Sequence, residues 1–204
     1  MTSCDNRDDL VLATKYTTSY MTHHKDRIQS NYGGSNAKSM KVSVDASLPK
    51  LQTSYIDLLY IHWWDCSTSI PEFMHALKDL VVSGNVIYLG ISDTPAWVVA
   101  KANQYARDQG LRQFSVYQGM WNAAMGDFEG DIIPMARDEG MALCPYGALN
   151  QGRFQTKEIF QERESHNPDE NLSLHRSMTR TSLPFLRRSV MLETRNCLTL
   201  LLRT

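Results

Sequence analysis

The chain has 204 residues, with 21 Lys and Arg against 22 Asp and Glu and a formal net charge of −1. Its mean hydropathy is −0.37 and 42% of its residues are hydrophobic, which is typical of a globular protein with a buried core. A charge this close to zero does not favour nucleic acid as a partner, and no apolar run reaches the roughly 18 residues of a membrane span.

The cysteines and the first residues bear on the cellular compartment. The four cysteines are far apart and form no Cys-x-x-Cys pair, and residues 1–9 are polar, without the apolar stretch of a signal peptide. This pattern favours reduced thiols in a cytoplasmic protein over a disulfide framework or a metal site. We therefore expect a cytoplasmic protein that binds no metal, no membrane and no nucleic acid. The oligomeric state is left open.

Short apolar runs that indicate strands alternate along the chain with stretches of helical periodicity. Strands are expected at 10–14, 55–61, 86–91, 114–117 and 141–144, and helices at 38–51, 71–83, 96–108 and 132–139. Pro71 suits the first turn of its helix, and Gly84, Gly110 and Gly140 suit helix ends. Such alternation predicts a parallel sheet covered by helices, either an open doubly wound sheet or a βα barrel.

The polar residues that close the apolar runs favour the barrel. They are Lys15, His62, Ser92 with Asp93, Gln118 and Tyr146. A βα barrel gathers the carboxyl ends of its strands on one face, where its site lies. An open sheet more often carries a glycine-rich phosphate turn after its first strand, and neither GxGxxG nor GxxxxGK[ST] occurs here.

The expected fold class is therefore α/β, an incomplete TIM (β/α)8 barrel. A complete barrel takes about 250 residues, whereas about five βα units fill this chain to near residue 160. We expect a partial barrel over 1–162. The segment 163–204 is polar and then rich in Arg, Ser and Leu without clear periodicity, and we expect it to be an irregular tail produced by a shifted reading frame or altered splicing.

Five segments, in this order, resemble one enzyme family. They are Ala13–Lys15, Asp57–His62, Gly90–Asp93, Tyr117–Asn122 and Pro145–Gly152. Together they are similar to the aldo-keto reductases, which are TIM barrels that use NADPH. The stretches Lys50–Thr53, His62–Asp65 and Ser92–Trp97 resemble the fungal aryl-alcohol dehydrogenase and norsolorinic acid reductase branch of that family.

The resemblance implies a role for each matched residue. Lys15 and His62 match the catalytic lysine and histidine at the ends of the third and fourth barrel strands. Ser92, Asp93 and Gln118 match the groups that hold the nicotinamide carboxamide, and Tyr146 matches the aromatic ring that stacks on the nicotinamide. The loop expected over the cofactor's pyrophosphate contains Gly147, Ala148, Leu149, Asn150, Gln151, Gly152 and Arg153.

Carbonyl reduction adds a hydride to carbon and a proton to oxygen. In the family a tyrosine gives the proton, a lysine ammonium lowers that tyrosine's pKa, an aspartate fixes the lysine, and a histidine orients the carbonyl. By the same resemblance the tyrosine and aspartate belong to a part of the barrel before Asp9. We expect the chain to lack both of them, together with strands one and two and the last strand.

The resemblance implies an NADPH-dependent carbonyl and alcohol oxidoreductase with a small-molecule substrate. The expected substrates are aryl aldehydes and alcohols, or a keto group in a fungal secondary metabolite. Two other functions stay open: a catalytically dead remnant or binding module without the tyrosine and aspartate, and a Schiff-base lyase with Lys15 as nucleophile. Residue by residue, Ser92 and Asp93 could instead cap the helix that begins near Pro95, and His62 could be a core histidine.

Overall fold

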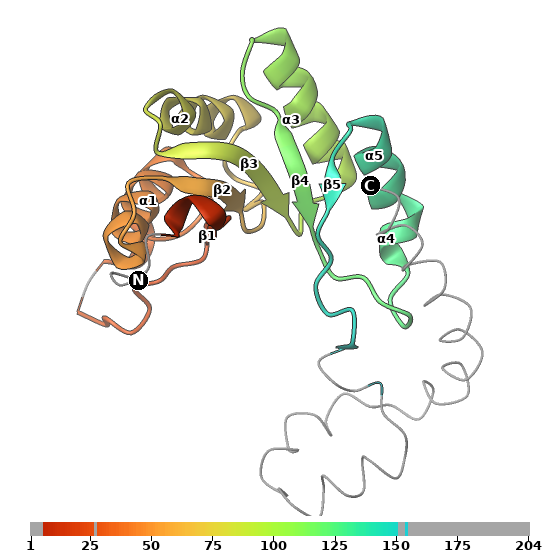
Figure 1. Cartoon of the computed structure of the whole chain (residues 1–204), viewed down its shortest axis with the longest axis horizontal. Helices are drawn as coiled ribbons and strands as arrows, with labels where there is room; N and C mark the ends of the chain where they lie inside the picture. The colour runs from red at the N-terminus through yellow and green to blue at the C-terminus, as the bar shows by residue number, and fades with distance from the viewer. Residues whose placement is uncertain (1–5, 27, 151–153, 155–204) are drawn as a thin grey trace, which may run out of the picture. The chain divides into compact units, whose positions relative to one another are not determined.

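The computed structural model describes residues 6–26, 28–150 and 154 (Figure 1). The chain divides into two compact units, residues 1–119 with 129–144 and residues 120–128 with 145–204. The first unit carries the sheet and the helices that pack on it.

Five parallel strands form one sheet in the order of the chain. They are β1 (Ala13–Tyr16), β2 (Ile56–Ile61), β3 (Val86–Ser92), β4 (Phe114–Gln118) and β5 (Ala142–Leu143). Sequential order without a reversal is that of a βα barrel, because a doubly wound sheet has a switch point where its strand order reverses. The α/β partial barrel predicted from the sequence is confirmed, and in the described residues no pairing joins β1 to β5 to close it.

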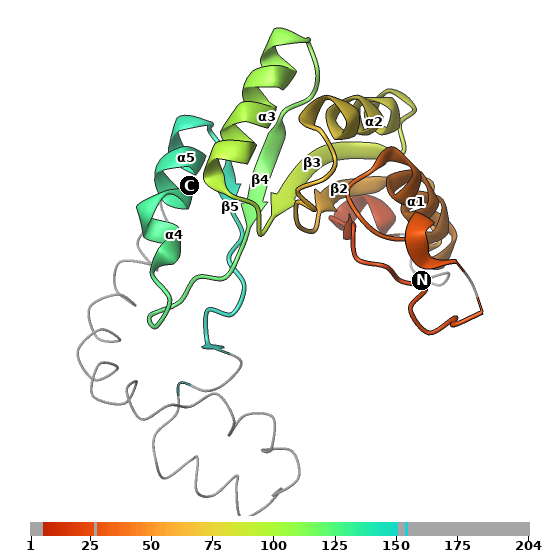
Figure 2. The same ribbon diagram turned by 180° about the vertical axis from the view of Figure 1, so that it is seen from behind.

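A helix follows each of the first four strands and lies on one side of the sheet (Figures 1 and 2). These helices are α1 (Ala37–Leu51), α2 (Ile70–Val82), α3 (Ala96–Asp108) and α5 (Ile132–Asp138). The Asn36 and Ser69 side chains cap α1 and α2 by accepting from backbone N–H groups of the first turn. Three short elements have no counterpart in the prediction: α4 (Asp127–Gly130) and the 3-10 turns Arg7–Asp9 and Gln29–Asn31.

The first strand begins later than the apolar run suggested. The run starts at Leu10, but Leu10 and Val11 are 37% and 78% exposed, and strand pairing starts at Ala13. The reason is Asp57, whose carboxylate accepts a 2.8 Å hydrogen bond from the Leu12 backbone N–H and thereby takes it from the strand ladder. Lys15 consequently lies inside β1 rather than after it.

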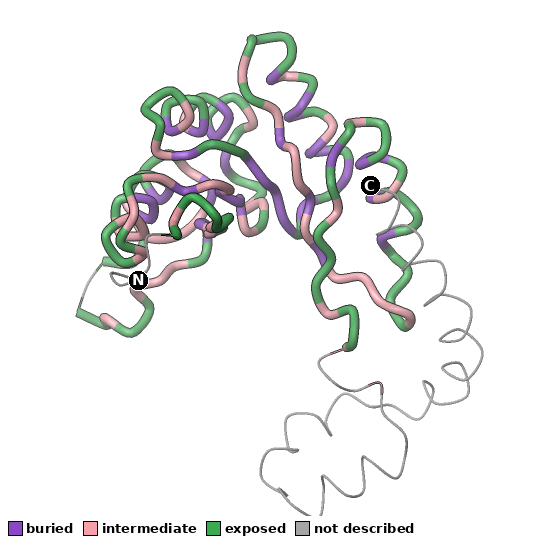
Figure 3. The backbone as a smooth tube through the Cα atoms, in the orientation of Figure 1, coloured by how far each residue is buried: buried purple, intermediate pink, exposed green. Residues whose placement is uncertain are grey.

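The two faces of the sheet have different roles. The strands and the helices both carry buried stretches (Figure 3). Tyr16, Leu59, Ile61, Leu89 and Ile91 are buried, and the register places these strand residues on one face, toward the helices. Because residues paired across parallel strands point to the same side, the register Lys15↔Tyr60↔Gly90 places these three residues together on the opposite face. That opposite face carries the polar groups predicted to be functional.

Gly90 is required by the ring beside it. A Cβ atom at Gly90 would lie 2.5 Å from Cδ1 and Cε1 of Tyr60, a side chain only 3% exposed. Gly90→Ala should therefore lower the free energy of unfolding by about 1–3 kcal/mol through overpacking, as measured by urea denaturation. Gly130→Ala is the matched control, because nothing lies within 4 Å of its Cβ position. Equal midpoints for the two variants would contradict this account of the Tyr60 packing.

Candidate active site

Lys15 reaches across the sheet to β3. Its Nζ atom donates a 3.3 Å hydrogen bond to Ser92 Oγ and lies 5.4 Å from the centroid of the Tyr60 ring. Burial lowers the pKa of Lys15, while Asp93 and Cys144 partly offset this effect. A partly desolvated ammonium interacts strongly with nearby groups. Such perturbed pKa values are common at functional sites and uncommon for lysines on the open surface.

His62 directly follows β2, and its backbone N–H donates to the Tyr16 carbonyl at 3.2 Å. Its Nδ1 atom lies 3.0 Å from Thr18 Oγ1. Burial lowers the pKa of His62, the nearby charge of Lys15 lowers it further, and Asp93 opposes both. Burial and the charge of Lys15 therefore favour the neutral form of His62, although the two residues are far apart in the sequence.

Ser92 and Asp93 form the turn that leaves β3. Ser92 is fully buried, and its Oγ atom donates to Asp93 Oδ2 at 3.1 Å while accepting from Lys15. Asp93 has a φ of 42°, in the left-handed region that aspartate tolerates better than most residues. The helix-capping interpretation of this pair is wrong, because α3 has Pro95 at its N-cap position and no side-chain cap.

Gln118 joins the same group from β4. The Asp93 backbone N–H donates to the Gln118 carbonyl at 3.0 Å, and Gln118 Nε2 donates to Cys144 Sγ at 3.6 Å. Lys15, His62, Ser92, Asp93 and Gln118 therefore meet at the carboxyl ends of four neighbouring strands, the place where βα barrels build their sites.

Four residues near this cluster were not assigned from the sequence: Thr18, Tyr60, Trp63 and Cys144. Burial, and next the adjacent Cys144 side chain, raise the pKa of Tyr60 to about 12. A phenol with so high a pKa is a poorer proton donor than an ordinary tyrosine, so we assign to Tyr60 the packing beside Lys15 rather than proton transfer. Strand periodicity could have indicated Tyr60, because it lies two residues before His62 and thus on the same face.

Tyr146 belongs to the second unit, where the backbone fixes it. It forms a parallel bridge with Met120, and its carbonyl accepts from the Trp121 N–H at 3.3 Å. The carbonyl of Gly147, which has a φ of +69°, accepts from Asn122 Nδ2 at 3.0 Å. The described loop continues through Ala148 and Leu149 to Asn150, whereas Gln151, Gly152 and Arg153 lie outside the described residues. The roles expected for Tyr146 and this loop stay predictions.

The groups at the strand ends fit a nicotinamide carboxamide. That group offers an amide donor and a carbonyl acceptor, and the cluster provides the Asp93 carboxylate and the Gln118 amide as complementary partners, beside the Ser92 hydroxyl, whose proton is directed to Asp93. In the described part of the chain, no group of three or more His, Cys, Asp or Glu side chains could hold a metal ion.

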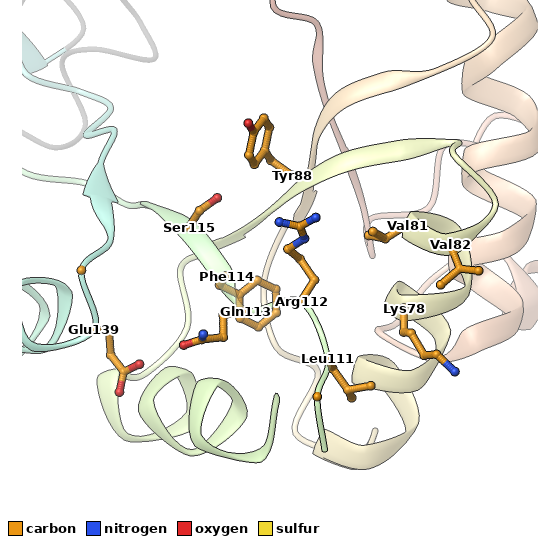
Figure 4. A pocket seen from close by; sticks show the side chains of 12 residues that line it. Lys78, Val81, Val82, Tyr88, Leu111, Arg112, Gln113, Phe114, Ser115 and Glu139 are labelled. Carbon is orange, nitrogen blue, oxygen red and sulfur yellow. The ribbon is translucent and has the colours of Figure 1, made fainter. Parts of the chain in front are cut away.

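A groove of about 610 Å³ lies elsewhere in the first unit (Figure 4). It is bounded by the end of α2 at Lys78 and Val82, by Tyr88 of β3, and by the turn from Gly110 to Phe114 that leads into β4. This turn enters β4 at its amino end, opposite the carboxyl end that bears Gln118. None of the predicted site residues is among its lining residues.

Comparison with known proteins gives the chain its family. The sequence model of the aldo/keto reductase family matches residues 2–197. Norsolorinic acid reductase B of Dothistroma septosporum is 69% identical over 193 residues, which are 95% of this chain and 48% of that protein. Norsolorinic acid reductase B of Aspergillus parasiticus is 71% identical over 167 residues, 82% of this chain and 44% of that protein.

An aryl-alcohol dehydrogenase of Pestalotiopsis microspora is 52% identical over 156 residues, 76% of this chain and 40% of that protein. The chain thus spans about half the length of the curated relatives it matches, or slightly less. The family match extends past residue 162, where the recognisable motifs end. The end of the partial barrel at residue 162 and the irregular tail over 163–204 stay predictions. No helix among the described residues is long and apolar enough to cross a membrane. The chain belongs to the aldo/keto reductase family.

Proposed function

We propose that this chain forms the part of an NADPH-dependent carbonyl reductase that holds the lysine, the histidine and the nicotinamide-binding groups. The observation that carries the proposal is the contact between Lys15 Nζ and Ser92 Oγ at 3.3 Å. It joins the group expected to support proton transfer to the group expected to hold the cofactor. Both belong to one cluster with His62 and Gln118.

Each side chain then has a defined task. The reduced nicotinamide supplies the hydride when it is bound. Ser92, Asp93 and Gln118 bind its carboxamide, and neutral His62 donates a hydrogen bond to the carbonyl oxygen of the substrate. The Lys15 ammonium lowers the pKa of the tyrosine that gives the proton.

The remaining assignments rest on the relatives. Tyr146 would stack on the nicotinamide, and the loop from Gly147 to Arg153 would cover the pyrophosphate. Proteins named norsolorinic acid reductase and aryl-alcohol dehydrogenase suggest aryl aldehydes and alcohols, or a keto group of a fungal secondary metabolite, as small-molecule substrates. The preference for NADPH over NADH and a cytoplasmic location are part of the same proposal.

Cofactor binding tests the proposal directly. NADPH should bind the chain with a change in its fluorescence, and Gln118→Ala and Ser92→Ala should each weaken binding about tenfold, because each removes one hydrogen-bonding group. Gln109→Ala is the matched control, since Gln109 is an exposed residue at the end of α3. Equal affinity in all three variants would place the cofactor elsewhere and overturn the assignment.

A longer polypeptide, here called the extended chain, separates the reductase from a catalytically dead remnant. It carries, in addition to this chain, those parts of the Dothistroma septosporum relative that lie outside the match. The extended chain should bind NADPH and reduce an aromatic aldehyde. An extended chain that folds and binds NADPH without any turnover would favour the remnant instead.

A further inference from the structure

Trp63, Thr18 and His62 form a chain of hydrogen bonds beside the cluster. Trp63 Nε1 donates to Thr18 Oγ1 at 3.1 Å, and Thr18 Oγ1 lies 3.0 Å from His62 Nδ1. An indole N–H can only donate, so this bond occupies an acceptor position of the Thr18 oxygen and leaves the hydroxyl proton available.

The direction of the second bond follows from that proton. In the described part of the chain, the Thr18 hydroxyl has Trp63 and His62 as its two hydrogen-bond partners. Since the Trp63 indole can accept nothing, His62 Nδ1 is the one acceptor that these two partners offer to the hydroxyl proton. A bond donated to Nδ1 requires that atom to be unprotonated, and a neutral imidazole then carries its one proton on Nε2, whereas the opposite direction would leave the hydroxyl proton to solvent.

The backbone around Thr18 is shaped for this contact. Thr17 is only 1% exposed and has a φ of 98°, which is strained for a β-branched residue and turns the chain as it leaves β1. The Thr17 carbonyl accepts from the Gly34 N–H at 2.8 Å, which fixes the turn.

Trp63 is tied down as well. Its carbonyl accepts a 3.2 Å hydrogen bond from Ser35 Oγ, and Asp65 Oδ2 accepts a 2.8 Å bond from the Ser35 backbone N–H. The backbones of both partners are therefore held by bonds of their own, since the His62 N–H also donates to the Tyr16 carbonyl, while the Thr18 and Trp63 side chains that meet are exposed.

We propose that Thr18, oriented by the Trp63 indole, is a positioning residue that fixes His62 in the tautomer with its proton on Nε2. In this arrangement Nδ1 accepts the hydrogen bond from Thr18, and Nε2–H stays available as a donor. That this donor meets a substrate carbonyl rests on the proposed function, whereas the tautomer does not.

The charges around His62 support the neutral ring that this arrangement needs. Lys15 of β1 faces it and lowers its pKa together with burial, while Asp93, after β3, acts in the opposite direction. A neutral imidazole has two tautomers of similar energy in water, so one hydrogen bond to Nδ1 is enough to select between them.

The test is a long-range ¹H–¹⁵N correlation spectrum of the 204-residue chain labelled at histidine nitrogen, with the His62 signals assigned by His62→Gln. Above the pKa of the ring, wild-type His62 should show a protonated Nε2 and an unprotonated Nδ1. Thr18→Val should produce a mixture of the two tautomers of His62. Trp63→Phe should change the tautomer population in the same direction. Thr18→Ser, which keeps the hydroxyl, should restore the single tautomer.

Thr14→Val is the matched control, because Thr14 lies within β1, before the turn that carries Thr18, and pairs with Leu59 on the face toward the helices. A wild-type ring protonated at Nδ1, or a tautomer unchanged by Thr18→Val, would overturn the proposal. In the extended chain, Thr18→Val should also lower kcat about tenfold without changing the NADPH affinity, as for the loss of one hydrogen bond. If the extended chain has no turnover while the tautomer results hold, the proposed function fails and the positioning of His62 stands.

Discussion

Replacing Lys15 with methionine is expected to remove most carbonyl reduction by the extended chain and to raise the pKa of His62. The ammonium contributes to lowering the histidine pKa, so its loss moves that pKa upward and increases the charged fraction of the ring near neutral pH. A charged His62 and a proton donor without its adjacent cation both slow the reaction. We expect kcat to fall about 10²-fold or more.

The pKa of His62 can be read by NMR titration in the chain itself, without turnover. Lys78→Met serves as the matched control, because Lys78 lies on α2 beside the groove and is not among the groups that shift His62. An unchanged His62 pKa in Lys15→Met would show that the two groups are not close enough to interact, and the site as described would be wrong.

The second large expected effect is a loss of stability on replacing Asp65. This residue lies in the loop after β2, and its carboxylate accepts a hydrogen bond from the Ser35 N–H, just before α1. Burial alone would raise its pKa, but hydrogen bonds from Thr68, Ser35 and Ser67 outweigh burial and lower the pKa to about 2 from its ordinary value of 3.8. A group whose pKa is lower in the folded state stabilises the protein above its unfolded pKa and loses that contribution as the pH falls.

Asp65→Asn should therefore reduce the free energy of unfolding at pH 7 by about 1–2 kcal/mol, a value reduced here for partial exposure to solvent. The difference from wild type should shrink as the pH falls from about 4 to about 2. Urea denaturation as a function of pH measures both quantities.

Asp45→Asn provides the comparison for Asp65. Asp45 pairs with Lys41 on the exposed surface of α1, and exposed pairs contribute little to stability. Equal losses in the two variants, or a difference that persists at pH 2, would mean that the bonds to Asp65 do not carry the stability assigned to them.

Much of the fold was predictable because local signals agreed with one another. Alternating apolar runs and helical stripes predicted five strands, and α3 begins and ends where the pattern placed it. The start of β1 differs from the prediction because a single long-range bond, from the Leu12 N–H to Asp57, removes a residue from the ladder. Composition does not show such a contact.

The part of the candidate site that could be predicted consists of the residues at strand ends and in the family motifs. These two signals predicted that Lys15, His62, Ser92 and Gln118 belong to one site. The contact of Gln118 with Cys144 and the closeness of Tyr60 to Gly90 depend on register and on space between strands. The bond from Trp63 to Thr18 depends on the turn at Thr17. Strand periodicity places Tyr60 on the same face as His62, but the contacts themselves have no signal in neighbouring residues.

The most direct test of the site is hydride transfer itself. The extended chain is given NADPH labelled with deuterium at the transferring carbon, together with an aromatic aldehyde, and the alcohol product is examined by mass spectrometry. We expect deuterium on the former carbonyl carbon, with Lys15→Met and His62→Gln greatly slowed. A folded extended chain that binds NADPH but forms no labelled alcohol, or one that forms it equally well without Lys15 and His62, would contradict the site proposed here.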